Sequence, residues 1–494
     1  MERNEIVDPA PTRWRWWPDA ILLALLALAV RIPAMFAPTQ LGYDDGGYGL
    51  AAVAMRQGYE PFRDIFSPQG PLFLPLVHVA DLVGLEHLNS PRLLAVAAGI
   101  AVTLAVYSIG CQTTDRGRAL LGAGIAAVSG VLLWTTGPLT GDGPGAAFAT
   151  WAVALAFAYR RSPTWPRVIG ITVLCGCAVA TKSLLVGPAL LVAWALVVSR
   201  RRWLHVALVP VGALAVVAAL AVPWGVDHVL NDYVRYHLDK TSNRKPGANF
   251  TKLWHTFVRR DTFLTILAAT AVVSAAVTAV LRRRRPVPAD GTASDRTRWW
   301  APPAGFLWSW AVVAFVVLLL QDPMFRNHLT ALVAPAALLV ARYRPDWRVV
   351  AVVGLVTVPI QASFLQPVLR PHDYSGPTEV IVDTLRGLPR DAWAISDEPG
   401  LVWRAGLGTD PNYVDSSVLR VDSRVRAIRI TEDRVLEAAA NPKVCAVVVT
   451  SEERFGSFAG LPTGLLRLGY DQTVDLGDGL GLYLRPGCDP GAGT

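Results

Sequence analysis

Two adjacent carboxylates follow the first long apolar run of the chain. Asp44 and Asp45 stand a few residues beyond the run from Ala20 to Ala37, within the segment YDDGGY at 43–48. An apolar run of roughly 20 residues is long enough to cross a bilayer. Carboxylates so close to hydrocarbon are costly unless they face water, a metal or a substrate. The pair therefore predicts the acid/base centre of an enzyme that works at the bilayer surface.

The composition predicts a polytopic helical membrane protein. Of the 494 residues, 52% are hydrophobic and only 17% are charged, and the mean hydropathy is +0.37. The sequence pI near 9.4 does not indicate nucleic-acid binding, because the basic residues lie between the apolar runs. We expect about eleven transmembrane helices, at 19–38, 90–110, 118–136, 145–159, 167–181, 183–199, 203–224, 262–281, 304–321, 328–341 and 348–366.

The arginine clusters predict which loops face the cytoplasm. With a cytoplasmic N-terminus, every tight arginine cluster falls on one side of the membrane, as the positive-inside rule requires. We therefore expect a multi-pass protein of the cell membrane whose C-terminus lies outside the cytoplasm, as does the first long loop, 39–89. The clusters are Arg116/Arg118, Arg160/Arg161/Arg167, Arg200 to Arg202, Arg282 to Arg285 and Arg342/Arg344/Arg348.

The pattern divides the chain into a membrane domain, 1–366, and an extracytoplasmic domain, 367–494. In the first outer loop, 51–57 and 72–79 are typical of short interfacial helices. In the tail, apolar runs shrink to strand length and helix-like stretches intervene, which predicts a small α/β domain. The predicted strands are 392–396, 444–450 and 480–484, and the predicted helices are 379–387 and 432–440. Outside the cytoplasm Cys445 and Cys488 could form a disulfide, or both could remain free thiols.

Glycosyl transfer is a reaction that the polar outer residues could support. It needs a carboxylate that takes the proton of the attacking hydroxyl, a positive group that holds the leaving phosphate, and an apolar groove for a lipid tail. Candidates for the carboxylates are Asp44, Asp45 and Asp142, and candidates for the positive groups are Lys182, Arg326 and His328 at the outer ends of spans.

Several short motifs, in this order, resemble one family of membrane enzymes. They are DDGGYGLAA at 44–52, GYEPFRD at 58–64, PQGPL at 68–72, Asp142 in its short loop, the pair 181–182 before an apolar helix, and FRNHL at 325–329 before the helix that contains Pro335. Together they resemble the GT-C membrane glycosyltransferases that use polyprenyl-phosphate sugars. The likeness is to the family-39 and aminoarabinose-transferase branch, which includes the protein O-mannosyltransferases, and it extends to about residue 340.

The resemblance implies a GT-C-like fold and roles for individual residues. Asp44 becomes the general base, and Asp45 orients it or binds a metal. Asp142 helps to bind a metal or the acceptor. Further substrate-binding candidates are Tyr48, Asp64, Gln69, Lys182, Arg326 and His328. The implied activity is that of an inverting hexosyl- or pentosyltransferase that moves a sugar from a polyprenyl-phosphate donor to a glycan, lipid or protein acceptor.

The chain departs from the family pattern at one informative position. Many relatives place a lysine that contacts the lipid phosphate directly before a Pro-Pro pair, and here Gln69 and Gly70 occupy those places. A glutamine donates a hydrogen bond but cannot neutralise a phosphate. The phosphate contact must therefore come from elsewhere, such as Lys182 or Arg326, or the chain uses another donor or a divalent cation such as Mg²⁺ or Mn²⁺, for which Asp45 and Asp142 are the candidate ligands.

Each candidate also has a purely structural interpretation. The Asp44–Asp45 pair could cap a helix, and Asp142 could serve the turn chemistry of Gly-Asp-Gly-Pro. Lys182 could extend its ammonium group to the interface, and Asp64 could pair with its neighbour Arg63. An interfacial anchor would explain Arg326 and His328.

Two other classes of function fit a polytopic protein. A transporter or flippase of lipids or sugars would be expected to show internal repeats and charges at mid-membrane. No convincing repeat is present, and Arg31 is the main charge within a span. A non-catalytic membrane scaffold that binds partners through its tail is the third hypothesis. The crowding of carboxylates at one mouth of the membrane region favours the enzyme.

Overall fold

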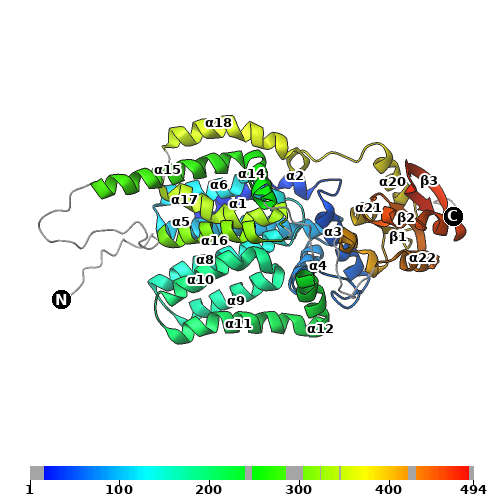
Figure 1. Ribbon diagram of the computed structural model, residues 1–494, viewed down its shortest axis with the longest axis horizontal. Coiled ribbons are helices and arrows are strands. Elements are labelled where there is room, and N and C mark those ends of the chain that lie inside the picture. The colour runs from blue at the N-terminus through cyan, green and yellow to red at the C-terminus, as the bar shows by residue number, and fades with distance from the viewer. Residues whose placement is uncertain are drawn as a thin grey trace, which may run out of the picture.

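A bundle of long helices forms the larger part of the molecule, and a small domain with a β-sheet lies at one end of it (Figure 1). The computed structural model describes residues 16–239, 247–284, 304–322, 324–343, 346–420 and 430–488. Helices α3 (Tyr43–Arg56) and α4 (Phe73–Val83) lie between the bundle and the small domain. The outer loop predicted to carry the chemistry therefore lies between the two parts of the protein.

The helices of the bundle overlap every predicted span. They are α1 (Trp16–Ala29), α5 (Leu93–Thr113), α6 (Arg116–Val128), α7 (Gly130–Thr136), α8 (Asp142–Arg161), α9 (Trp165–Thr181), α10 (Ser183–Val198), α11 (Trp203–Ala221), α15 (Thr262–Arg284), α16 (Ala304–Leu320), α17 (Val333–Tyr343) and α18 (Trp347–Phe364). Among the described residues, four helical segments are long and apolar enough to cross a membrane alone, and α6 with α7, bent by 56°, would make a fifth. Several of the remaining helices are apolar but shorter.

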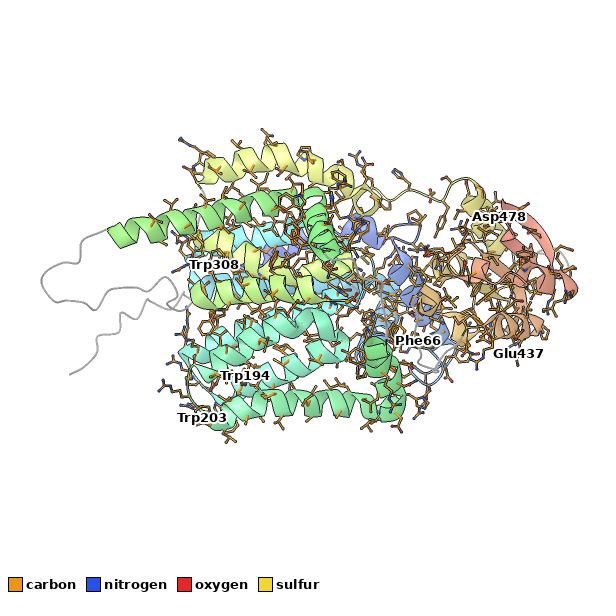
Figure 2. The ribbon with its side chains drawn as sticks, in the orientation of Figure 1. Phe66, Trp194, Trp203, Trp308, Glu437 and Asp478 are labelled. Carbon is orange, nitrogen blue, oxygen red and sulfur yellow. A yellow bond between two sulfur atoms is a disulfide. The ribbon has the colours of Figure 1, made fainter. Side chains whose placement is uncertain are left out.

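The arginine-rich loops gather at the end of the bundle that lies away from the small domain. Arg342 donates to the carbonyl oxygen of Thr113 at 2.9 Å, and Arg202 donates to that of Pro163 at 3.2 Å. Figure 2 shows Trp203, next to one of these loops, at the opposite end of the molecule from Asp478 of the small domain. The arginine clusters and the small domain therefore occupy opposite ends, as expected if they lie on opposite sides of a membrane.

Helix α3 corrects the prediction for the first outer loop. It begins at Tyr43 and not at residue 51, so Asp44 and Asp45 lie in its first turn. The prediction missed this start because Gly46, Gly47 and Gly49 are poor helix formers, and tertiary packing overrides that weak preference. Most of the helix is buried, so α3 is not the surface-lying amphipathic helix that was predicted.

The glycines of α3 allow the small domain to pack directly on the helix backbone. A Cβ atom added to Gly46 would lie 2.6 Å from the Cα of Gly400, and one added to Gly49 would lie 2.2 Å from the indole ring of Trp403. Both partners belong to α21 (Pro399–Ala405) of the small domain. Contacts this close are possible only without a side chain, which explains the glycine-rich sequence after the two aspartates.

The small domain is built on a four-stranded mixed sheet. The strands are β1 (Trp393–Ser396), β2 (Val444–Val449), β3 (Asp471–Gly477) and β4 (Leu480–Leu484), in the spatial order β1-β2-β4-β3. The β1–β2 pair is parallel and the other two pairs are antiparallel. Helices α20 (Pro377–Arg386), α22 (Glu432–Ala440) and α23 (Leu461–Arg467) complete the domain. The predicted strands and helices are present here, within a residue or two of their expected ends.

Strand β3 was not among the predicted strands. This strand lies at the edge of the sheet and is largely exposed, so it lacks the apolar run that identifies a buried strand. It joins β4 through a hairpin whose turn residues, Asp478 and Gly479, both have positive φ. Cys445, within β2, and Cys488, after β4, form a disulfide with their Cα atoms 5.7 Å apart.

Candidate functional site

Asp45 is fully engaged in a buried ion pair. Arg92, at the outer end of α5, donates to Oδ2 of Asp45 at 2.5 Å and to Oδ1 at 3.1 Å. The amides of Leu41 and Leu139 donate to the same two oxygens at 2.9 and 2.8 Å. Burial raises the pKa of Asp45, but the charge of Arg92 and these hydrogen bonds hold it below its ordinary value. A carboxylate that accepts four hydrogen bonds has no remaining lone pair to offer.

Arginines from two parts of the chain fix the segment that precedes α3. Arg92 donates to the carbonyl oxygens of Ala37 and Thr39 at 2.9 and 2.7 Å. Arg404 of α21 donates to the same two oxygens at 2.9 and 3.1 Å. Both guanidinium groups also stack on the ring of Trp403. The first turn of α3 is therefore held by the bundle and by the small domain together.

Asp44 and Tyr48 lie one helical turn apart, on one face of α3. The phenol of Tyr48 is buried, packs edge-on against Phe73 of α4, and accepts a hydrogen bond of 2.6 Å from Nε2 of Gln69. Burial raises the pKa of Tyr48, and the charges of three carboxylates, Asp44, Asp415 and Asp142, raise it further. These carboxylates come from three separate parts of the sequence, and the charge of each acts on one phenol.

The backbone at Gln69 lies against the junction of α9 and α10. The amide of Gly70 donates to the carbonyl oxygen of Thr181 at 3.2 Å, and that of Leu72 donates to Ala180 at 2.8 Å. A Cβ atom on residue 70 would lie 2.2 Å from the oxygen of Ala180, so only glycine fits. Lys182 is the single extended residue between the two helices. The fold thus brings Lys182 close to the segment that carries Gln69.

Asp142 lies between two side chains that can bind an anion. Its carboxylate is 3.8 Å from Nζ of Lys182 and 3.9 Å from Nε2 of His328, and all three side chains are largely buried. Two buried oxygens in this region, Oδ1 of Asp142 and Oε1 of Gln69, accept no hydrogen bond from the described residues. Buried polar atoms normally have partners, so this cluster has the capacity to bind a ligand.

Two of the predicted substrate-binding residues lie elsewhere. The carboxylate of Asp64 is exposed and accepts a hydrogen bond of 2.8 Å from the amide of Glu60 within its own loop. Arg63 pairs with Glu60 at 2.6 Å, so the suggested Arg63–Asp64 pair is wrong. Arg326 is exposed. Burial lowers the pKa of the neighbouring Arg260 to about 10, and the positive charge of Arg326 contributes to the shift.

The predicted metal ligands do not fit a divalent cation. All acceptor positions of Asp45 are used by Arg92 and backbone amides. Asp142 faces Lys182 and His328, positive or hydrogen-bonding groups that would compete with a cation for its carboxylate. Within the described ranges, no group of three or more His, Cys, Asp or Glu side chains is arranged to hold a metal. The predicted Mg²⁺ or Mn²⁺ site at Asp45 and Asp142 therefore has no support in these contacts.

Three residues that shape the site were not predicted as site residues from the sequence: Arg92, Tyr43 and Asp415. Arg92 follows Ser-Pro at the start of a predicted span, and a charge at that depth was a usable signal for a buried partner. The hydroxyl of Tyr43 donates to Asp415 at 3.1 Å, across 372 residues of sequence. No periodicity or motif in the chain indicates that contact.

One sequence family matches part of the chain. Residues 71–226 match the family described as dolichyl-phosphate-mannose-protein mannosyltransferase. The match includes Asp142 and Lys182 and begins after the Asp44–Asp45 pair. A search of curated protein sequences finds no significant match.

Three solved structures are similar to this chain to different degrees. ArnT from Cupriavidus metallidurans bound to undecaprenyl phosphate aligns with a TM-score of 0.61 at 13% identity, over 96% of this chain and 98% of that chain. The archaeal oligosaccharyltransferase AglB from Archaeoglobus fulgidus, in complex with an inhibitory peptide and a dolichol-phosphate, gives 0.49 at 12% identity, over 93% and 72%. The oligosaccharyltransferase of Archaeoglobus fulgidus in complex with Zn and sulfate gives 0.48 at 13% identity, over 92% and 71%.

The likeness to ArnT identifies the fold. The chain is a multi-pass membrane protein with a GT-C fold and a small α/β region at its C-terminal end, which confirms the predicted fold class. The resemblance noted in the sequence is confirmed at the level of the fold, and the mannosyltransferase family matches a central part of the membrane region.

Proposed function

We propose that the protein is a membrane glycosyltransferase that transfers a sugar from a polyprenyl-phosphate donor to an acceptor hydroxyl at the outer face. One observation carries this proposal: Lys182, His328 and the under-bonded Asp142 meet Gln69 and Tyr48 in a buried cluster beside Asp44. An anion site next to a carboxylate is what displacement of a phosphate requires. The likeness in fold to ArnT, whose structure holds undecaprenyl phosphate, supports the choice of donor.

The cluster assigns a role to each group in a single displacement. Asp44 takes the proton of the acceptor hydroxyl as the oxygen forms a bond to the anomeric carbon of the sugar. The bond from that carbon to the phosphate oxygen breaks on the opposite face, and the configuration inverts. The electron pair stays on the leaving polyprenyl phosphate, where Lys182 and His328 stabilise the charge.

Asp45 acts in this scheme by holding α3, and it exchanges no proton. Its ion pair with Arg92 and its bonds to the amides of Leu41 and Leu139 link the start of α3 to the bundle. The adjacent Asp44 is thereby kept at a fixed position on the helix. Of the two roles expected for Asp45, orientation of Asp44 is the one that these contacts support.

Lys182 is the proposed substitute for the lysine that the family places near residue 69. Thr181 and Ala180 accept hydrogen bonds from the backbone at residues 70 and 72, so Lys182 lies beside Gln69 although 113 residues separate them. The charge has moved to a neighbouring helix junction, while the glutamine retains a donor bound to Tyr48. Arg326, exposed beside Arg260, is the weaker candidate for this contact.

The proposed orientation places the N-terminus in the cytoplasm and the small domain outside it. The arginine loops meet at one end of the bundle, in agreement with the positive-inside rule. The Cys445–Cys488 disulfide belongs to the other end, and disulfides persist in oxidising compartments. Alkaline phosphatase fused after residue 488 should be active in intact cells, whereas activity only of a fusion within 282–285 would reverse the orientation.

The direct test is transfer by the purified protein in vesicles. The donors are decaprenyl phosphates carrying radiolabelled mannose or arabinose, and the acceptors are octyl glycosides of the same sugars and a threonine-containing peptide. We expect release of decaprenyl phosphate, with label in an acceptor or in free sugar, and inverted configuration at the new bond. Movement of intact donor between leaflets, with no bond broken, would support a flippase instead. If the donor is neither moved nor cleaved, the scaffold hypothesis is favoured.

A further inference from the structure

The small domain places part of its own chain against the catalytic face of α3. The carbonyl oxygen of Val414 would lie 3.6 Å from a Cβ atom on Gly47, in ordinary contact with the helix. The hydroxyl of Tyr43 donates to Oδ1 of Asp415 at 3.1 Å and lies 2.9 Å from Oγ of Ser416. Residues 414–416 are therefore neighbours of the turn that carries Asp44.

Asp415, which is bonded to Tyr43 of α3, also acts through its charge on the same buried phenol as Asp44. Beyond the effect of burial, its negative charge raises the pKa of Tyr48 and also that of Tyr236, on α13 (Tyr236–Asp239). Tyr236 packs edge-on against Phe66, with ring centroids 5.3 Å apart. Figure 2 shows Phe66 between the bundle and the small domain. Asp415 thus faces side chains of α3 and of the outer loops, at the outer side of the site.

The hydrogen bonds of Asp415 leave half of its carboxylate available. Within the described part of the chain, both bonds go to Oδ1, from the Tyr43 hydroxyl at 3.1 Å and from the amide of Ser417 at 2.8 Å. Asp45, in contrast, uses both of its oxygens. A carboxylate that is fixed through one oxygen and open at the other is suited to accept a hydrogen bond from a ligand.

The site has two sides, because α3 lies between the bundle and the small domain. On the membrane side lie Lys182, His328 and Asp142, whose buried Oδ1 has no hydrogen-bond partner among the described residues. On the outer side lie Asp44 and Asp415. A leaving phosphate with an attached lipid belongs on the membrane side, so the acceptor must approach from the side of Asp44 and Asp415.

We infer that Asp415 is an acceptor-binding residue contributed by the small domain, and that the acceptor is a carbohydrate. The inference rests on the proposed function. A sugar can offer its attacking hydroxyl to Asp44 and a neighbouring hydroxyl to Asp415, which matches two carboxylates from different elements. A serine or threonine side chain offers only one hydroxyl, and Asp44 would use it. The small domain thereby sets acceptor specificity.

The experiment separates acceptor binding from cleavage of the donor. Transfer from decaprenyl-phosphate mannose or arabinose to the matching octyl glycoside is measured beside hydrolysis of the donor by water. Asp415→Asn should lower kcat/KM for the octyl glycoside roughly tenfold or more, because it removes a charge-assisted hydrogen bond. This fall in kcat/KM should come from a higher KM for the acceptor. The rate of hydrolysis and the KM for the donor should stay unchanged.

Two variants distinguish binding from a merely structural role. Asp410→Asn changes a half-buried carboxylate in the same segment, which caps the short helix at 411–413, and it keeps that capping ability, so it should leave all rates unchanged. Tyr43→Phe removes the anchoring hydroxyl but leaves the carboxylate. If Tyr43→Phe raises the acceptor KM as much as Asp415→Asn does, Asp415 is only an anchor and the inference fails.

The outcomes also separate this inference from the proposed function. A wild-type protein that neither hydrolyses the donor nor transfers its sugar would overturn the proposed function. Active wild type with an unchanged acceptor KM in Asp415→Asn would overturn the inference alone. Efficient transfer to the threonine peptide, with no transfer to any octyl glycoside, would overturn the assignment of a carbohydrate acceptor. Loss of hydrolysis in Asp415→Asn would move the residue to the donor side and also overturn it.

Discussion

Two polar clusters lie at the end of the helix bundle that is next to the small domain, and they differ in how completely their hydrogen bonds are satisfied. In the saturated cluster, Asp45, Arg92 and Asn89 bond to one another and to backbone groups, and every buried polar atom of Asp45 and Arg92 has a partner. In the open cluster, formed by Tyr48, Gln69, Asp142, Lys182 and His328, the separations at Asp142 are near 4 Å and two buried oxygens have no described partner. Adjacent residues of α3 therefore serve different purposes.

The difference shows how one short motif can both build a site and carry its chemistry. A buried ion pair with all its hydrogen bonds satisfied resists change, because removal of either partner leaves an uncompensated charge. Such a pair is suited to hold α3 in place. Polar groups that await a partner are suited to bind a ligand, since the ligand then satisfies them. Asp45 belongs to the first kind, and Asp44 faces the second.

The largest loss of transfer is expected from Asp44→Asn. An amide cannot take the proton of the acceptor hydroxyl, and general-base catalysis typically contributes roughly 10²–10⁴-fold. The variant should fold normally, because the saturated cluster remains intact. Initial rates of sugar transfer in vesicles and thermal unfolding in detergent together measure this expectation.

Asp64→Asn is the matched control for the Asp44 variant. Asp64 lies in the same outer loop, but its exposed carboxylate only accepts a bond from the Glu60 amide. We expect transfer to change less than twofold. Equal losses in the two variants would remove the distinction that the structure draws between them and restore Asp64 as a substrate-binding residue.

A smaller loss is expected from Lys182→Met, which removes the proposed phosphate charge from the open cluster. Charge-assisted hydrogen bonds contribute roughly 1.5–3 kcal/mol, so the donor KM should rise on the order of 10- to 100-fold. Lys182→Arg should recover part of the loss, because the charge returns with a different shape. Lys443→Met, at an exposed lysine of the small domain, is the control.

Donor kinetics of these variants also test the structural interpretation of Lys182. If the lysine only extends to the interface, Lys182→Met would change stability or yield but not the donor KM. If the donor KM is normal in Lys182→Met but raised in Arg326→Met, the phosphate contact would instead be assigned to the pair formed by Arg326 and Arg260.

Loss of stability exceeds loss of transfer in the prediction for Asp45→Asn. The variant leaves Arg92 buried without a counter-charge, and breaking such a pair costs roughly 3–5 kcal/mol. We expect a lower unfolding temperature and less folded protein, while the folded fraction keeps transfer within about tenfold of wild type. A stable variant that is as inactive as Asp44→Asn would instead place Asp45 among the catalytic residues.

The sequence allowed the membrane helices and five members of the open cluster to be named, but not the contacts that organise them. Apolar runs and arginine clusters are local signals, and each predicted span overlaps a helix. The start of α3 was hidden by its glycines, and β3 by its exposed position at the sheet edge. The pairs Asp45–Arg92 and Tyr43–Asp415 join residues that are 47 and 372 positions apart, which no local pattern encodes.

No loss of transfer is expected from Asp232→Asn, which tests whether a buried carboxylate with a raised pKa must be functional. Asp232, on the outer loop after α11, accepts a long bond of 3.4 Å from the amide of Ser67, and burial raises its pKa to about 7 although hydrogen bonds from Ser67 and Asn231 oppose the rise. The folded protein therefore holds its proton where the unfolded chain has released it. This contribution to the free energy of unfolding should be fully present near pH 4. It should fall by at most roughly 4 kcal/mol as the pH rises to about 7, and then stay constant.

Asp232→Asn cannot titrate, so its unfolding temperature should exceed that of wild type at pH 8 and approach it at pH 4.5. The amide fills nearly the same volume and is neutral in both states, which removes the cost of burying a charge. Unfolding temperatures at pH 4.5, 6 and 8, with transfer rates at pH 7, give the comparison. If transfer collapses while stability is unchanged, Asp232 belongs to the open cluster, and the boundary of the catalytic site extends to the loop after α11.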